Sequence, residues 1–101
     1  MARPGLVIKF TAKPENAERF AGILSEALGR VEPEPGTTPW MAMRGEEDPN
    51  TFFVVDLHAN KEALETHMNG SAAALVLGEG GKLLDRDPEV AITTLISGKA
   101  V

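Results

Sequence analysis

The sequence predicts an α+β domain with the element order β-α-β-β-α-β. Three observations lead to this fold class. Apolar residues alternate with period two over residues 6–12 and again over 51–58, as they do in half-buried strands. Between these segments, residues 14–31 repeat apolar side chains at helical spacing. The β-branched segment 90–96 supplies a further strand near the end of the chain.

The first strand and the first helix follow one another directly. The strand over residues 6–12 places Leu6, Ile8, Phe10 and Ala12 on one face. Pro14 suits the first turn of a helix, because the N–H that proline lacks would be unpaired there in any case. The helix predicted from about Pro14 to about Val31 has one apolar stripe, made of Ala17, Phe20, Leu24, Ala27, Leu28 and Val31.

Two strands joined by a polar turn form a hairpin in the middle of the chain. The strand over residues 37–44 places Trp40, Ala42 and Arg44 on one side and Met41 and Met43 on the other. Pro39 near its start favours an edge position for this strand or an irregular start of its pairing. The strand over residues 51–58 is the clearest in the chain, and one of its faces consists of Phe52, Val54, Asp56 and His58.

A second helical region precedes the last strand. Asn60 is a good N-cap and Gly70 a natural end for a helix that places Leu64, His67 and Met68 on one side. Residues 71–77 predict a further short helix. The glycine-rich segment after it, residues 78–81, predicts a loop, since glycine weakens helices.

This order corresponds to the ferredoxin-like arrangement, a four-stranded antiparallel sheet with helices on one face. Both faces of the predicted sheet contain large apolar side chains, yet the helices of one chain cover only one face. We therefore expect the other face to pack on a second copy, which gives a homodimeric α/β barrel.

Composition limits the class of protein further. The 101 residues, 43% of them hydrophobic and 25% charged, suit one globular domain over residues 1–101. Ten Lys and Arg against fifteen Asp and Glu give a net charge of -5, which argues against nucleic acid as a partner. Cysteine is absent, so the chain forms no disulfide and has no thiolate metal site. The longest apolar run, residues 72–77, is too short to cross a membrane, and the first residues lack the apolar core of a signal peptide. We expect a cytoplasmic protein.

Three residues are candidates for proton transfer. His67 lies on the apolar side of its helix, where a neutral imidazole beside a hydrophobic cavity would make a general base. The alternative is a packed histidine bonded to a backbone carbonyl. Asp56 and His58 share one strand face and could form an acid–imidazole pair, or they could be two solvated groups at a strand end.

Two further residues are candidates for ligand binding. Trp40 could form the wall of a pocket, or it could belong to the core. Arg44 on the same face could hold a ligand, or it could be a solvated charge at the end of a strand. Two histidines nine residues apart are weak evidence for a metal, and we expect no metal site from this spacing.

Several segments together resemble the antibiotic biosynthesis monooxygenase domain family. They are Glu34-Pro35-Gly36, the aromatic Trp40, the run Asp48-Pro49-Asn50-Thr51-Phe52 and the run Lys61-Glu62-Ala63-Leu64-Glu65-Thr66-His67. The resemblance extends over about residues 5–97. It implies a homodimeric α+β barrel with a ligand pocket between each sheet and its helices. The characterised members of the family include quinol and anthrone monooxygenases that need neither flavin nor metal.

The resemblance also implies roles for individual residues. His67 matches the histidine on the second helix of the family, and Trp40 and Phe52 match aromatic residues beside the pocket. The chain departs from the family at the end of the third strand, where Asp56-Leu57-His58 stands in place of Glu-x-Trp or Glu-x-Tyr. Heme-degrading relatives have an Asn on the first strand and a Trp at the end of the third, which argues against heme degradation here.

The expected function is a monooxygenase without a cofactor, with dioxygen and a small aromatic quinol, anthrone or polyketide-like substrate as its partners. His67 would be the base or an orienting group, and His58 and Asp56 would be a second proton-handling pair. The substrate-binding residues would be Trp40, Phe52, Met68 and Arg44. Two alternatives stay open: a dimeric ligand-binding or accessory protein without catalysis, and a polyketide cyclase or isomerase.

Overall fold

The computed structural model describes residues 3–101, and its elements follow the predicted order. The strands and helices are β1 (Pro4–Thr11), α1 (Ala17–Val31), β2 (Thr37–Arg44), β3 (Thr51–His58), α2 (Lys61–Met68), α3 (Ser71–Leu77) and β4 (Glu89–Thr94). Two short 3₁₀-helices, η1 (Pro14–Asn16) and η2 (Gly80–Leu83), precede α1 and β4.

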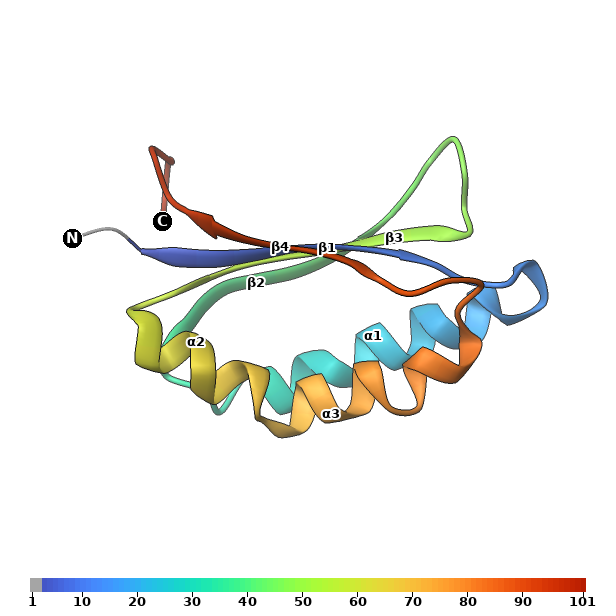
Figure 1. Ribbon diagram of the computed structural model, residues 1–101, viewed down its shortest axis with the longest axis horizontal. Helices are drawn as coiled ribbons and strands as arrows, with labels where there is room; N and C mark the ends of the chain where they lie inside the picture. The colour runs from blue at the N-terminus through green and yellow to red at the C-terminus, as the bar shows by residue number, and fades with distance from the viewer. Residues whose placement is uncertain (1–2) are drawn as a thin grey trace.

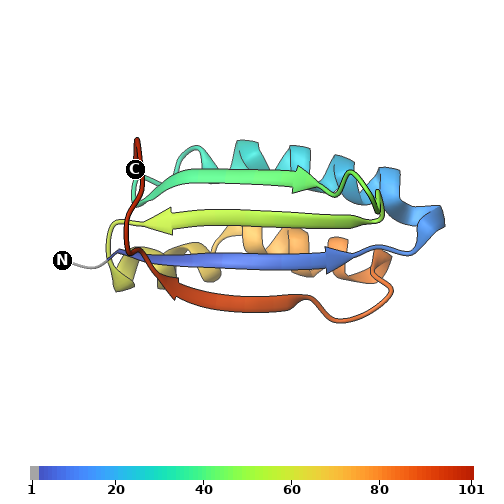
Figure 2. The same ribbon diagram turned by 90° about the horizontal axis from the view of Figure 1, so that it is seen from above.

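The four strands form one antiparallel sheet in the order β2-β3-β1-β4 (Figure 2). The register between the two central strands pairs Leu6 with Asp56 and Phe10 with Phe52. Side chains directly opposite one another point to the same face of a sheet. Leu6, near the start of β1, therefore shares a face with Asp56 near the end of β3. Phe10, near the end of β1, shares that face with Phe52 near the start of β3.

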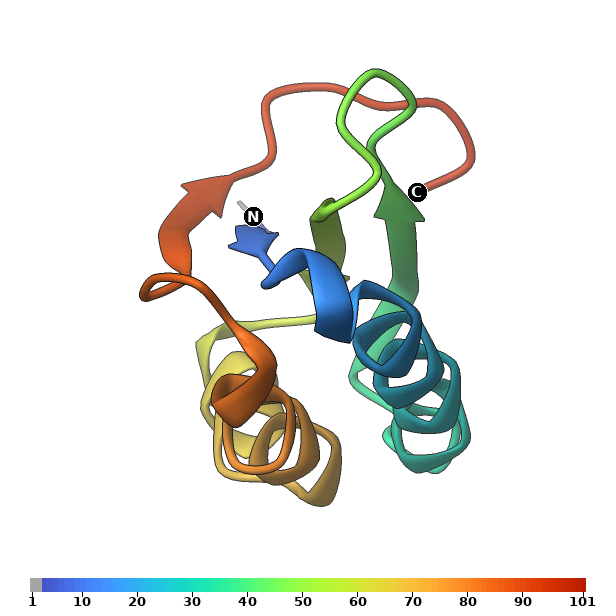
Figure 3. The same cartoon turned by 90° about the vertical axis from the view of Figure 1, so that its right-hand side faces the viewer.

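All helices lie on one face of the sheet (Figure 1). Seen along the sheet, α1 lies beside a row formed by α2 and α3, and both rows pack beneath the strands (Figure 3). The predicted ferredoxin-like α+β fold is confirmed. No helix within residues 3–101 has both the length and the apolar character needed to cross a membrane.

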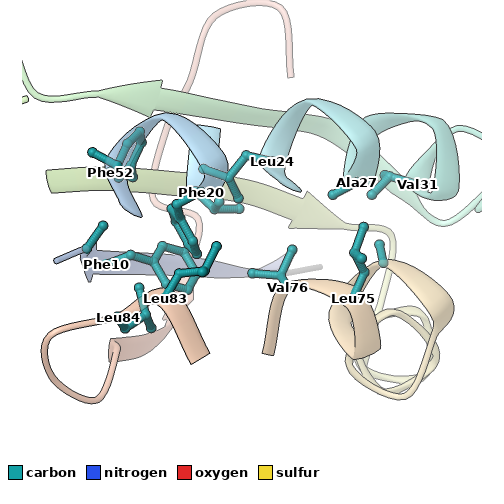
Figure 4. Close-up of a cluster of buried hydrophobic side chains, with 14 residues drawn as sticks. Phe10, Phe20, Leu24, Ala27, Val31, Phe52, Leu75, Val76, Leu83 and Leu84 are labelled. Carbon is teal, nitrogen blue, oxygen red and sulfur yellow. The ribbon is translucent and has the colours of Figure 1, made fainter. Parts of the chain in front are cut away.

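The core lies between the sheet and the helices, and aromatic rings dominate one end of it (Figure 4). Phe20 of α1 is fully buried between Phe10 and Phe52, and its ring centroid lies 5.1 Å from each of theirs. Such tilted and edge-on ring pairs contribute beyond the area they bury. The predicted apolar stripe of α1 faces this core, except that Leu28 stays 45% exposed.

The structure corrects some predicted boundaries. The segment 78–81 was predicted as a loop, but its second half starts η2, which ends at the buried Leu83. The first turn of the long helix is the separate 3₁₀-helix η1, which begins at Pro14. The last strand ends at Thr94 rather than at residue 96, and Ala12 forms an isolated bridge with Leu84.

Strand β2 is an edge strand, as Pro39 predicted. Its register with β3 shifts between Thr37 and Trp40, which is where the proline interrupts the pairing. The shift lets Thr37 stand opposite His58 and face the helices. The irregular start of β2 thus places a hydroxyl at the polar end of β3.

The face of the sheet opposite the helices keeps exposed apolar side chains. Its centre is a row across three strands in which the pairing places Met41 beside Val55 and Val55 beside Val7. Met41 is 43% exposed and Val7 is 40% exposed. These residues form the open face of the sheet, which the helices of the chain do not cover (Figure 1).

Candidate functional site

A cluster of polar side chains lies between the sheet and α2, in an otherwise apolar layer. Asp56 and His58 occupy the last inward positions of β3 and are 1% and 0% exposed. The alternation of the strand turns both side chains toward the helices, as it turns Phe52 and Val54. His67 of α2 and Glu34 of the turn before β2 complete the polar cluster together with Thr37.

His58 is held from both sides. Its Nδ1 lies 3.0 Å from the Thr37 hydroxyl, and its Nε2 lies 2.5 Å from Oδ1 of Asp56. The Thr37 hydroxyl donates its proton to Oε1 of Glu34 at 3.2 Å, so it accepts a hydrogen bond from His58 Nδ1–H. Nε2 of a neutral His58 then has a lone pair, and one proton is shared between Nε2 and Asp56.

His67 is oriented by a carboxylate. Its Nδ1 lies 2.7 Å from Oε1 of Glu34, so Nδ1–H donates to Glu34 and Nε2 is left as the basic nitrogen. That Nε2 lies 3.6 Å from Oδ2 of Asp56, and the His67 ring centroid is 5.0 Å from that of His58. Both histidines therefore direct Nε2 toward the same buried carboxyl group.

Two local features bring α2 and the turn together. Asn60 begins α2 by accepting a hydrogen bond from the backbone N–H of Ala63 at 2.8 Å, as its N-cap position predicts. Gly36 packs against the same turn of α2, and a Cβ on it would lie only 2.5 Å from the Cβ of Ala63. Only glycine permits this close approach, which places Glu34 within reach of His67.

The carboxyl group of Asp56 is the most perturbed titratable group of the cluster. Burial raises its pKa above the ordinary aspartate value of 3.8, although the two imidazoles beside it lower the pKa in part. Its Oδ2 is buried and has no hydrogen-bond partner. Buried carboxylate oxygens without a partner are rare, and they often mark a functional role or an unseen ligand.

An apolar cavity of about 120 Å³ opens beside the polar cluster. His67 and Trp40 are the lining residues whose side chains contain nitrogen, and the other lining side chains are apolar. They come from the sheet and from α2 and α3: Leu6, Ile8, Phe10, Val54, Met68, Ala72, Ala73, Val76, Leu77 and Val90. The cavity thus gives an apolar ligand contact with one buried imidazole.

A second hollow lies on the other side of Trp40. This groove between α1 and β2 has a volume of about 430 Å³ and includes Arg44 and Phe52 in its wall. Arg44 donates to the backbone oxygen of Pro49, stands 5.1 Å above the Phe52 ring and pairs with Glu18 at 2.7 Å. The guanidinium of Arg44 is therefore engaged with the protein itself.

The family model for antibiotic biosynthesis monooxygenases matches residues 5–74 of this sequence. The chain belongs to that family. This agrees with the resemblance seen in the sequence, and the match includes Glu34, Thr37, Asp56, His58 and His67.

Solved structures extend the comparison over the whole family fold. A Nitrosomonas europaea protein of unknown function, NE2512, is 31% identical with a TM-score of 0.90, covering 100% of this chain and 96% of its own. A Caulobacter crescentus protein, provisionally named an antibiotic biosynthesis monooxygenase, is 18% identical with a TM-score of 0.86, covering 95% of this chain and 92% of its own. A conserved Methanosarcina mazei protein is also 18% identical, with a TM-score of 0.84 and 92% of both chains covered. No protein of curated function matches the sequence.

The residues singled out from the sequence divide between two places in this family member. Asp56, His58 and His67 meet in the polar cluster, and none of them is a solvated surface group. Trp40 and Met68 line the cavity beside them, whereas the remaining two candidates, Phe52 and Arg44, line the groove on the far side of Trp40.

Two members of the polar cluster were not predicted from the sequence. Glu34 appeared only as part of a turn, and Thr37 only as the first residue of a strand. His67 bonds to Glu34 rather than to a backbone carbonyl. The one available signal was the turn Glu34-Pro35-Gly36, whose glycine marks a close approach of the backbone to another element.

Proposed function

We propose that this family member is a monooxygenase that uses no cofactor and acts on a small aromatic quinol or anthrone. One observation supports this most directly: an apolar cavity whose wall includes a buried imidazole that is hydrogen-bonded to a carboxylate. Neutral aromatic rings favour such a cavity, and the imidazole supplies the base that oxygenation of a phenol needs.

The chemistry starts with proton removal. Nε2 of His67 takes the hydroxyl proton of the substrate, and Glu34 stabilises the resulting imidazolium through Nδ1–H. The electron-rich anion reduces dioxygen, a C–O bond forms, and His67 returns the proton to the peroxide oxygen. Loss of water then leaves a carbonyl group. One oxygen atom enters the substrate and the other leaves as water, and the substrate itself supplies all four electrons.

Asp56 and His58 would handle the second proton of the reaction. Water leaves only after a second C–H proton has been removed from the substrate and a proton has reached the leaving hydroxide. Because Asp56 lies 3.6 Å from His67 and 2.5 Å from His58, it would relay a proton between the two imidazoles. The buried position excludes bulk water, which strengthens each charge interaction in the relay.

The size of the cavity favours a one-ring substrate. A volume of about 120 Å³ is similar to the roughly 150 Å³ of an engineered apolar cavity that holds benzene. Trp40 and Met68 would contact the ring. Leu77 and Val90, each 55% exposed, lie at the rim, so a larger substrate would extend past them. On this proposal Phe52 and Arg44 support the wall that contains Trp40 rather than touching the ring.

We also propose a homodimer formed through the open face of the sheet. Met41, Val55 and Val7 form an apolar row there, and burial of such a row in a two-sheet interface removes its apolar surface from water. Val55→Lys would convert the dimer to a monomer in sedimentation velocity, whereas Glu62→Lys on α2 would leave the dimer unchanged. A wild-type chain that sediments as a monomer contradicts this part of the proposal.

Oxygen uptake by chelator-treated protein tests the activity. We expect uptake with members of a panel of hydroquinones, naphthols and anthrones, and at least a hundredfold loss in His67→Ala, since general-base catalysis contributes about 10²–10⁴-fold. Glu65→Gln, on the exposed side of the same helix, serves as the matched control with unchanged uptake. Turnover that is unchanged in His67→Ala would show that His67 is not the catalytic base. Ring binding without any uptake would favour the ligand-binding or isomerase alternatives.

A further inference from the structure

We propose that Asp56, His58 and His67 form a binding site for one divalent transition-metal cation. Each offers one ligand atom, the three atoms lie within 4.8 Å of one another, and all three residues are buried. Two imidazoles and one carboxylate are a ligand set that suits Zn²⁺, Co²⁺ and Fe²⁺, in contrast to the all-oxygen sites of Ca²⁺ and Mg²⁺.

The distances fit a shared cation. Nε2 of His67 and Oδ2 of Asp56 are 3.6 Å apart, close to the separation of about 3.3 Å between two atoms bound to one tetrahedral metal at 2.0–2.1 Å. Nε2 of His58 approaches the same carboxyl group through Oδ1. A cation between the three groups would thus need small movements of side chains that already converge.

The outer partners of the histidines match those of metal-bound histidines. Metal ligands of this type donate their other ring N–H to a carboxylate or another acceptor, which fixes the ring and makes it a better ligand. Here Nδ1 of His67 donates to Glu34, and Nδ1 of His58 donates to Thr37, which itself donates to Glu34. A single glutamate therefore orients both ligand rings.

A second, independent observation points to a missing ligand. Oδ2 of Asp56 has no hydrogen-bond partner, although the side chain is fully buried. An unpaired carboxylate oxygen in this position is costly, and a cation is the ligand that would compensate it best. The adjoining cavity lined by His67 leaves room for a further ligand on the cation, such as water or a small molecule.

This inference concerns the same residues as the proposed function but does not depend on that chemistry. A cation on Nε2 of His67 and a proton on the same nitrogen exclude one another. Metal binding would therefore remove the base. The proposed site also takes the place of the expectation, drawn from the spacing of the histidines, that the chain has no metal site. For this reason the oxygen-uptake test uses chelator-treated protein, and the metal test measures binding rather than turnover.

Titration of chelator-treated protein with Co²⁺ under anaerobic conditions tests the site. We expect one equivalent to bind and to give visible d–d absorption typical of a low-symmetry nitrogen and oxygen site. Zn²⁺ should displace it, whereas Mg²⁺ should not. Asp56→Asn and His67→Gln are expected to abolish the absorption, and circular dichroism would verify that both variants fold. Glu65→Gln keeps all ligands and should behave as the wild type.

Glu34→Gln tests the positioning role separately. Loss of an outer carboxylate partner typically weakens metal binding by roughly 10–100-fold, and we expect a Co²⁺ dissociation constant raised by that factor with the cation-free protein still folded. The proposal is wrong if Co²⁺ fails to bind in a saturable 1:1 ratio. It is equally wrong if Asp56→Asn and His67→Gln bind Co²⁺ as tightly as the wild type, because the cation would then lie elsewhere.

Discussion

Replacement of Asp56 by Asn should make the cation-free protein more stable at neutral pH. The wild-type carboxyl group is fully buried, its Oδ2 has no partner, and burial raises its pKa. An asparagine of the same shape is neutral, and its amide N–H₂ donates to His58 Nε2, the nitrogen that has a lone pair because Nδ1 donates to Thr37. The variant thus keeps the contact without a buried charge.

The size of the gain follows from the same features. Each unit by which burial raises the pKa of Asp56 costs the folded state about 1.4 kcal/mol once the unfolded chain is ionised. An unsatisfied buried acceptor costs about 1–3 kcal/mol. Part of that cost remains in the amide, so we expect Asp56→Asn to raise the free energy of unfolding by roughly 1–3 kcal/mol at neutral pH.

The pH dependence gives the prediction its sign. In the unfolded chain Asp56 ionises near its ordinary value of 3.8, whereas in the folded state it keeps its proton to a higher pH. The folded wild type therefore loses stability, relative to the variant, as pH rises from 3.8 through the raised pKa. Below 3.8 both states hold the proton, and this contribution to the difference vanishes.

Urea unfolding followed by circular dichroism, repeated across this pH range, measures the effect. The exposed Asp87→Asn serves as a control and should change stability by less than about 0.5 kcal/mol at any pH. A variant that is less stable than the wild type at neutral pH would refute the reasoning, since it would mean that the ion pair with the imidazoles outweighs the cost of burial. A gap that widens toward low pH would refute it too.

Four further predictions concern other parts of the molecule. Phe20→Ala should lower the free energy of unfolding by about 3–5 kcal/mol in urea, because the ring fills the space between two other phenylalanines. Asn60→Ala should cost about 1 kcal/mol in the same assay through loss of the α2 cap. Arg44→Gln should cost a little stability at neutral pH and less in acid or high salt, where the ion pair with Glu18 no longer contributes. The hydrogen bond and charge of Arg44 lower the pKa of Glu18 from 4.5, so this stabilisation is lost as pH falls through the lowered pKa. Glu34→Gln should slow oxygen uptake at least tenfold with little change in KM, because it weakens the base without touching the substrate.

The fold was predictable because its signals are local. Alternation over β3 and the apolar stripe of α1 each follow from a few neighbouring residues, and together they fix which side of each element faces the core. Boundaries were less predictable at η2, where glycines that disfavour a helix nevertheless form one turn. There Gly80 packs against Phe20, and tertiary contact decides the local conformation.

The polar cluster was predictable only in part, for a related reason. Asp56 and His58 belong to one strand, so their shared face is visible in the sequence. The contacts of His67 with Glu34 and Asp56 join residues that are 33 and 11 positions away in the sequence, and no pattern encodes such pairs. Burial was also hidden, since a polar strand end is as compatible with solvent as with a closed interior.

The aromatic cluster and the polar cluster occupy opposite ends of the same sheet. Phe52 at the start of β3 and Phe10 at the end of β1 anchor one end, whereas Asp56 and His58 stand at the other. Substitutions at distant, independent sites add rather than interact. The polar end can therefore exchange residues while the aromatic end still holds the fold together. Because stability and chemistry depend on opposite ends of the sheet, substitutions at the polar end can change the chemistry without loss of the folded state.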